Sequence, residues 1–172
     1  MVGSGFRTKG VDRTMRAVAA LPPHLLNQAT LIIIGHDNFR PFKRLARRLG
    51  ISERLLFFHG RTDIPRFLFA ADLLVHPAYR ETTGTILVEA LAAGLPVLAS
   101  DVCGFSPHVA RSGGGRLVAS PFDQKVFSDL VADMLVSPLR AQWRRNGMRY
   151  VQQTDVFSRA QRAVDMIERL LA

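Results

Sequence analysis

The chain has 172 residues, 48% of them hydrophobic, which is enough for one domain with a buried core and too few for two. A single cysteine, Cys103, excludes an intramolecular disulfide, agrees with a reducing cytoplasm, and is expected to be a small buried hydrophobe. No apolar run approaches the roughly 20 residues that cross a bilayer, and residues 1–10 lack the apolar run of a signal peptide. We therefore expect a soluble protein.

The charge is strongly positive. Lysine and arginine number 23 against 14 acidic residues, giving a formal charge of +9 and a pI near 11.1, which favours an anionic partner. The arginines gather at helical spacing in residues 40–48 and 140–149, so they form either solvated helix faces or a surface for an anionic membrane or acceptor. A nucleic-acid partner is not expected, because the chain lacks interleaved aromatic residues and any nucleic-acid-binding motif.

The first third of the chain alternates helix and strand. Met1 and Val2 lead directly into a glycine-rich stretch where a first strand should already be ending, so the chain reads as the later part of something longer. Apolar positions at helical spacing predict a helix from Val11 to Ala19 and another that contains Leu45, Leu49 and Ile51. Between and after these helices, the apolar runs 31–35 and 55–60 predict buried parallel strands.

The same alternation continues to the end of the chain. The runs 72–77, 96–100 and 115–119 predict three more strands, and a helix begins near Gly84. Later helices are predicted over 126–135, after Pro138, and over 158–171. Strands that alternate with helices predict a Rossmann-like, doubly wound α/β domain, a parallel sheet with helices on both faces.

Ligands of such sheets bind beyond the carboxyl ends of the strands, and the loop after the run 72–77 carries the strongest signal. Gly84 and Thr85 begin a helix whose apolar face starts at Ile86, and they offer backbone N–H groups to an anion. Glu89 follows by about five residues, roughly 7 Å along the helix, where it suits the hydroxyls of a ribose. Glu81 lies in the preceding loop, within reach of a sugar on the far phosphate. The alternative is that Glu81 caps the helix and Glu89 is a solvated charge.

Two further loops carry weaker signals. The glycine-rich loop that contains Arg7 and Lys9 precedes a helix and makes a phosphate cradle in principle, without the spacing of a P-loop. Arg61 follows a strand and either lies near a phosphate or base or belongs to a surface turn. The histidines, cysteine and acidic residues show no ligand spacing, so no metal site is expected.

Together these loops resemble glycosyltransferase family 4, which has the two-domain GT-B fold. The marker is Glu81-x7-Glu89, followed by the apolar, glycine-containing run 90–97, and weaker matches extend in order through nearly the whole chain. Several stretches, among them 70–79 and 101–105, are similar to transferases that add the first glucose to the inner-core heptose of lipopolysaccharide.

The resemblance implies the donor-binding, C-terminal half of a GT-B enzyme whose N-terminal acceptor half is missing. It implies UDP-glucose as donor, retaining transfer without a metal or other cofactor, a lipopolysaccharide core acceptor, and a cytoplasmic position on the anionic inner-membrane surface. A non-catalytic module that acts with a separate partner chain is the alternative.

Carried over by motif, the donor site has one catalytic residue, Glu81, on the donor glucose. Family members usually have Arg directly before the lysine, where Thr8 stands here, so whether Arg7 supplies that cation stays open. The other residues implied to bind the nucleotide sugar are Lys9, Arg7, Arg61, Gly84, Thr85, Ile86 and Glu89.

Overall fold

Five short parallel strands form the framework of the structure, a computed structural model that describes residues 1–156 and residue 158. Strand β1 (Leu31–Ile34) pairs with β2 (Leu55–Phe58). In a second sheet, β4 (Val97–Ser100) lies between β3 (Leu74–His76) and β5 (Gly115–Val118). All five predicted strands are present, each slightly shorter than its apolar run.

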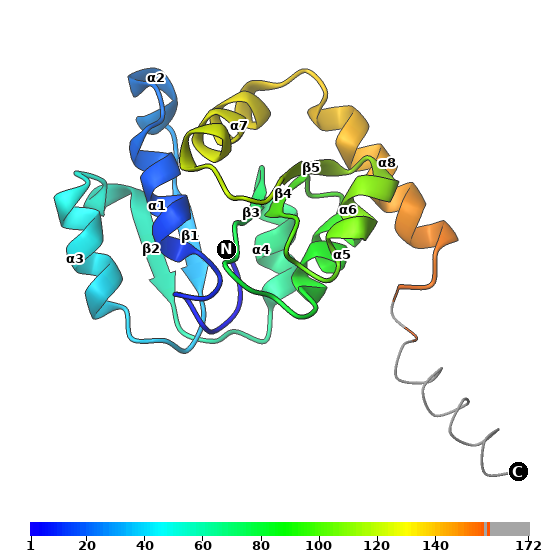
Figure 1. Cartoon of the computed structure of the whole chain (residues 1–172), viewed down its shortest axis with the longest axis horizontal. Helices are drawn as coiled ribbons and strands as arrows, with labels where there is room; N and C mark the ends of the chain where they lie inside the picture. Colours follow the sequence, from blue (N-terminus) through cyan, green and yellow to red (C-terminus); the bar gives the residue numbers. More distant parts are fainter. Residues whose placement is uncertain (157, 159–172) are drawn as a thin grey trace, which may run out of the picture.

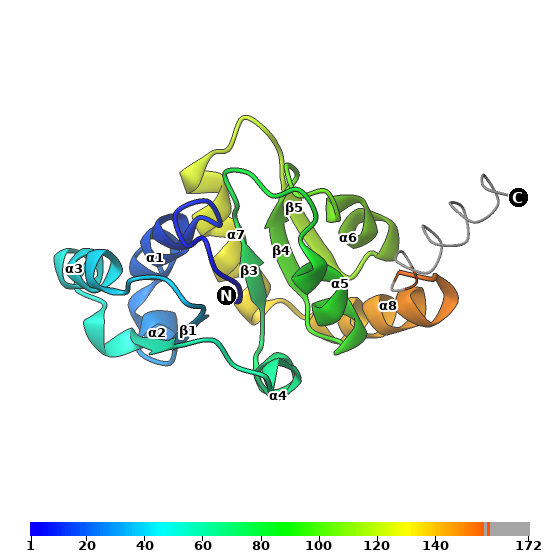
Figure 2. The same ribbon diagram turned by 90° about the horizontal axis from the view of Figure 1, so that it is seen from below.

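The first three residues extend the smaller sheet. Val2 forms a parallel bridge to Ile34, Gly3 donates its N–H to the Ile34 carbonyl at 2.9 Å, and the Met1 amino group donates to the Ile32 carbonyl at 2.7 Å. The N-terminus lies between the two sheets (Figures 1 and 2). Burial lowers the pKa of the Met1 amino group to about 5.

Helices fill the intervals between strands. The predicted helix over 11–19 is confirmed, and Gly84 precedes a helix as predicted. Leu49 and Ile51 lie just beyond their helix rather than in it, because Gly50 has a φ of +69° and ends the helical path. The predicted helix over 158–171 lies outside the described residues, apart from residue 158. The helices are α1 (Val11–Ala19), α2 (Pro23–Leu26), α3 (Arg40–Arg48), the 3-10 turn η1 (Ser52–Arg54), α4 (Ile64–Ala70), α5 (Thr85–Ala92), α6 (Ser106–Ser112), α7 (Gln124–Val136) and α8 (Arg140–Gln153).

Successive residues of the central strands pack into opposite cores, which shows that helices cover both faces of the sheet. Val75 and Leu98 join a core that includes side chains of α1, α3 and α7. Their neighbours Leu74, Val97 and Ala99 join a second core built largely from α5 and α6, with side chains of α8 packed against it. Because side chains alternate across a strand, this division confirms the predicted doubly wound class.

Two strands are less buried than predicted. Strand β2 lies at the edge of the smaller sheet, and its Leu56 is 48% exposed. Strand β5 is also an edge strand, with Arg116 exposed. An apolar run alone therefore does not reveal which strand is central. Within the described residues, no helix is long and apolar enough to span a membrane.

Candidate functional site

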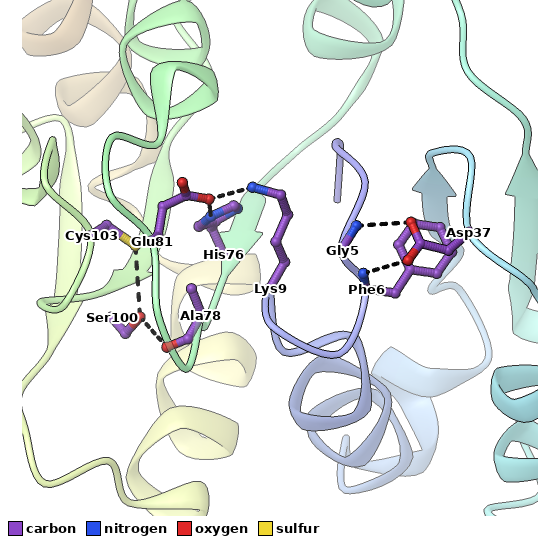
Figure 3. A network of polar contacts seen from close by, with 9 residues as sticks. All are labelled: Gly5, Phe6, Lys9, Asp37, His76, Ala78, Glu81, Ser100 and Cys103. Atoms are coloured by element: carbon purple, nitrogen blue, oxygen red, sulfur yellow. Dashed lines mark hydrogen bonds and ion pairs between the residues drawn. The ribbon is translucent and has the colours of Figure 1, made fainter.

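Lys9 and Glu81 approach each other from two loops at the carboxyl ends of the strands. Lys9 ends the glycine-rich loop before α1, and Glu81 lies in the loop between β3 and α5. The Lys9 ammonium donates to a carboxylate oxygen of Glu81, and Figure 3 shows the two side chains pointing toward each other. Only 20% and 13% of these side chains are exposed, so the ion pair is largely sheltered from water.

His76, at the end of β3, is the second partner of Glu81. Its Nε2 lies 3.3 Å from Oε2 of Glu81, its ring is completely buried, and its Nδ1 has no hydrogen-bond partner among the described residues. Burial, and next the charge of Lys9, lower the pKa of His76 to about 4, so the ring is neutral at neutral pH. A neutral ring beside a carboxylate carries its proton on Nε2 and donates it to Glu81.

Glu81 remains charged at neutral pH. Burial by itself raises its pKa, but the hydrogen bond and the charge of Lys9 act in the opposite direction, and the pKa is lowered overall. The site therefore holds a carboxylate that two donors, Lys9 and His76, fix in place.

The loop after β4 binds the backbone around Glu81 through two hydrogen bonds. The Glu81 carbonyl accepts the Gly104 N–H at 3.1 Å, and the Thr83 carbonyl accepts the Phe105 N–H at 2.8 Å. A Cβ atom at Gly104 would lie 2.1 Å from the Thr82 carbonyl oxygen, so this contact requires glycine. The loop thus sets the backbone that carries Glu81.

The loop that carries Lys9 is also held on both sides. Asp37, after β1, accepts the N–H groups of Gly5 at 2.9 Å and Phe6 at 3.1 Å (Figure 3). On the other side, a Cβ atom at Gly10 would lie 2.0 Å from the Pro77 carbonyl oxygen, and Gly10 has a φ of +73°. These contacts fix the position of Lys9 relative to Glu81.

The first turn of α5 opens into the same space. Gly84 adopts the left-handed conformation with a φ of +81°, and no side chain caps the turn that follows. The first N–H groups of a helix have no partner within it, so they form a positive end that attracts an anion. A cavity of about 220 Å³ adjoins this turn and is lined by Val2, Gly3, Lys9, Ile64, Glu81, Thr83, Gly84, Thr85, Ile86 and Glu89.

Six of the eight site residues named from the sequence line this one cavity. They are Lys9, Glu81, Gly84, Thr85, Ile86 and Glu89. Arg61 does not line it: the Arg61 guanidinium is exposed and binds the Asp63 carboxylate through two hydrogen bonds of 2.8 and 2.9 Å, which raise its pKa. Arg7 lines a different cavity on the far side of its loop.

Sequence analysis missed His76 and Asp37. His76 ends β3 and Asp37 lies three residues after β1, at the edge where polar side chains of parallel sheets reach a site. That position was the available signal, but neither residue belongs to a spaced motif. Within residues 1–156 and residue 158, no group of three or more His, Cys, Asp or Glu side chains is arranged to hold a metal ion.

Comparison with known proteins shows the family of the chain. The model of the group 1 glycosyl transferases matches residues 1–150, so the chain belongs to the group 1 glycosyltransferases. Its parallel, doubly wound fold is that of GT-B enzymes.

Particular relatives share much of the sequence. The chain is 42% identical over 167 residues to the lipopolysaccharide glucosyltransferase WaaG of Escherichia coli (strain K12), a match that covers 96% of this chain and 45% of that protein. A crystal structure of WaaG superimposes with a TM-score of 0.93 at 40% identity, over 96% of this chain and 46% of the other. Anabaena Alr3699/HepE in complex with UDP-glucose matches with a TM-score of 0.81 at 26% identity, over 98% and 48%. The chain thus spans about half the length of these relatives.

Proposed function

We propose that this chain is the donor-binding half of a glucosyltransferase that moves glucose from UDP-glucose to a heptose of the lipopolysaccharide inner core, with retention and without a metal. One observation carries the proposal. The Lys9–Glu81 ion pair, the first turn of α5 and Glu89 line a single cavity. A cation, a helix N-terminus and two carboxylates are the groups that a diphosphate with a sugar at each end would require.

The donor would lie along this cavity with its diphosphate at the centre. Lys9 and the N–H groups of Thr85 and Ile86 would bind the phosphates, and Glu89, further along α5, would accept the ribose hydroxyls. Glu81 would accept hydroxyls of the glucose, as the catalytic-site carboxylate that orients the transferred sugar. At about 220 Å³ the cavity is smaller than the roughly 300–1,000 Å³ of most ligand pockets. It would therefore enclose the middle of the donor and leave its ends to other surfaces.

The relatives support the substrates. WaaG is named as a lipopolysaccharide glucosyltransferase, and Alr3699/HepE was solved with UDP and with UDP-glucose. The first resemblance supports glucose as the transferred sugar and lipopolysaccharide as the acceptor, and the second supports a uridine nucleotide.

Transfer would require a second half that positions the acceptor hydroxyl against the donor sugar. Positioning two reactants about 3–3.5 Å apart can supply roughly 7–11 kcal/mol of a barrier, and a closed site keeps water out. The described residues form the two small sheets of one doubly wound domain, and the donor cavity lies among the loops at the carboxyl ends of their strands. We therefore propose that the preceding half of a GT-B enzyme, absent from this chain, closes over the donor.

The charge supports a position on the cytoplasmic surface of the inner membrane. Five cations lie within Arg40–Arg48 of α3, and none of their side chains has an ion-pair partner in the described part of the chain. Exposed cations on one helix attract anionic lipid headgroups.

A fusion of the N-terminal half of E. coli WaaG to this chain tests the proposal. The fusion should transfer glucose from UDP-glucose to heptose-containing lipopolysaccharide and form an α linkage. The isolated chain should show only background transfer and background donor hydrolysis. Glu81→Gln in the fusion should abolish most transfer, and the matched control Glu53→Gln, on η1, should not. Clear turnover by the isolated chain would refute the assignment. A folded fusion whose glucose transfer is unchanged by Glu81→Gln would refute it as well.

A further inference from the structure

A second cavity lies beside the donor site, on the other side of the same two loops. It has a volume of about 530 Å³, within the range of ligand pockets, and lies where α1 packs against α3. Arg7 and Thr8, next to Lys9, form one wall, and Tyr79 and Arg80, next to Glu81, form another. A molecule held here would thus border residues that the donor sugar would contact.

Three unpartnered cations surround this second cavity. Arg7, Arg48 and Arg80 line it, and none of their guanidinium groups makes a hydrogen bond or ion pair with any described residue. By contrast, Arg61 and Arg140 pair with carboxylates. Guanidinium groups without a carboxylate partner attract a phosphate or carboxylate and bind it through paired N–H groups.

Part of the lining of the second cavity is apolar, and its aromatic ring is held in one position. Phe42 and Leu45 of α3 form part of it. Tyr79, 46% exposed, is fixed by a hydrogen bond of 2.9 Å from its hydroxyl to Asp12 and by the Arg13 guanidinium, 3.5 Å from its ring centre. Asp12 also lines the cavity, but it accepts the Tyr79 hydroxyl and is outnumbered by the three arginines. A fixed aromatic face beside cations suits a sugar ring that carries an acidic group.

We propose that the second cavity binds the acidic group of the acceptor, a phosphorylated, heptose-containing saccharide. The inference rests on the proposed function, because it assigns the second substrate to the surface next to the donor. The donor occupies the cavity between Lys9 and Glu89, so the acceptor must approach from a neighbouring surface. The second cavity provides one with the complementary charge.

The test measures binding of two soluble probes to the full chain by calorimetry. One is a deacylated, phosphorylated heptose oligosaccharide from lipopolysaccharide, and the other is the same oligosaccharide after its phosphates are removed. The variant Arg48→Gln/Arg80→Gln should bind the phosphorylated probe at least tenfold more weakly than the wild type, because a lost charge-assisted hydrogen bond corresponds to about a tenfold change or more. The dephosphorylated probe should bind both proteins weakly and alike.

The control variant Arg44→Gln/Arg47→Gln removes the same charge from α3 but spares the second cavity, and it should keep wild-type affinity. Each of three results would overturn the proposal: no saturable binding by the wild type, equal losses in both variants, or, in a parallel titration with vesicles that contain phosphatidylglycerol, a loss for the vesicles alone. The last would assign the second cavity to a membrane lipid. A UDP titration of the same proteins separates this proposal from the donor assignment, since UDP binding does not depend on Arg48 or Arg80.

Discussion

At the scale of single residues, His76 determines how the site responds to pH. Its buried ring has a pKa of about 4, below the ordinary 6.5, because burial and Lys9 both oppose a second positive charge. Between these two values the unfolded chain binds a proton that the folded chain does not. The free energy of unfolding therefore falls as the pH falls from 6.5 toward 4.

From this we predict a loss of about 2 kcal/mol of stability between pH 7 and pH 5 that is attributable to His76. The variant His76→Gln keeps an N–H donor for Glu81 and does not titrate, so its urea-unfolding free energy should vary less with pH by that amount. Glu81 contributes little above pH 5, because the ordinary pKa of 4.5 that it has in the unfolded chain and its lowered pKa in the folded chain both lie below that pH. The exposed His24 supplies the control His24→Gln, which should keep the wild-type dependence. An unchanged slope in His76→Gln would contradict the assignment.

Lys9 gives a prediction about which part of the donor it contacts. If its ammonium binds phosphate, Lys9→Ala should weaken UDP binding by about 1.5–3 kcal/mol and leave uridine binding almost unchanged, because uridine has no phosphate. The parallel variant Arg7→Ala decides whether Arg7, which lines the second cavity, also contributes to the phosphate clamp. Lys125→Ala, on the exposed face of α7, serves as control. Calorimetry that shows equal losses for UDP and uridine would move Lys9 out of the phosphate site.

Spaced motifs made some site residues predictable and left others hidden. Glu81 and Glu89 were identifiable because their separation is read directly along one loop and one helix, and both line the cavity. Asp37 acts through contacts with Gly5 and Phe6, more than 30 residues away, and no local pattern encodes those contacts. His76 lies only five residues before Glu81, but no spaced motif marks it. Arg61 belongs to no spaced motif, and its side chain binds the nearby Asp63 carboxylate rather than lining the cavity.

At the scale of elements, the long helices and the strands followed from apolar periodicity, and the short helices did not. Helices α4 and α6 have only seven residues each, and both have a proline at their start. Each buries a narrow apolar face, which gives too few repeats for a recognisable period. The edge position of β2 was equally hidden, because it depends on which strands pair and not on the sequence of β2 itself.

The junction between α1 and the loop after β3 depends on Gly10. An added Cβ would meet the Pro77 carbonyl oxygen at 2.0 Å, and the residue has a φ of +73°. Gly50 has a similar φ of +69° but nothing within 4 Å of its Cβ position. Gly50→Ala should therefore cost about 1–2 kcal/mol for left-handed backbone alone, and Gly10→Ala at least about 2 kcal/mol more. Urea unfolding of the two variants measures the difference, and equal losses would show that the contact with Pro77 tolerates a side chain.

At the scale of the whole molecule, two hydrophobic cores fix the position of the Lys9 loop relative to the helix that carries Glu89. The core of α1, α3 and α7 carries the Lys9 loop, and the core of α5, α6 and α8 carries the helix with Glu89. Both cores share the strands β3 and β4, whose alternating side chains enter one or the other. The ion pair between Lys9 and Glu81 spans these two parts of the molecule (Figure 3). Donor binding should therefore be a property of the folded chain as a whole.

A calorimetric titration of the purified chain with UDP, UDP-glucose, ADP-glucose and GDP-mannose tests the donor assignment most directly. We expect saturable binding of UDP and UDP-glucose, weaker binding of the other two, and a loss of about 1.5–3 kcal/mol in UDP affinity for Glu89→Ala. The control Glu53→Ala, which removes a carboxylate remote from the cavity, should bind as the wild type does. No UDP binding by the folded chain, or full UDP affinity in a folded Glu89→Ala variant, would contradict the account.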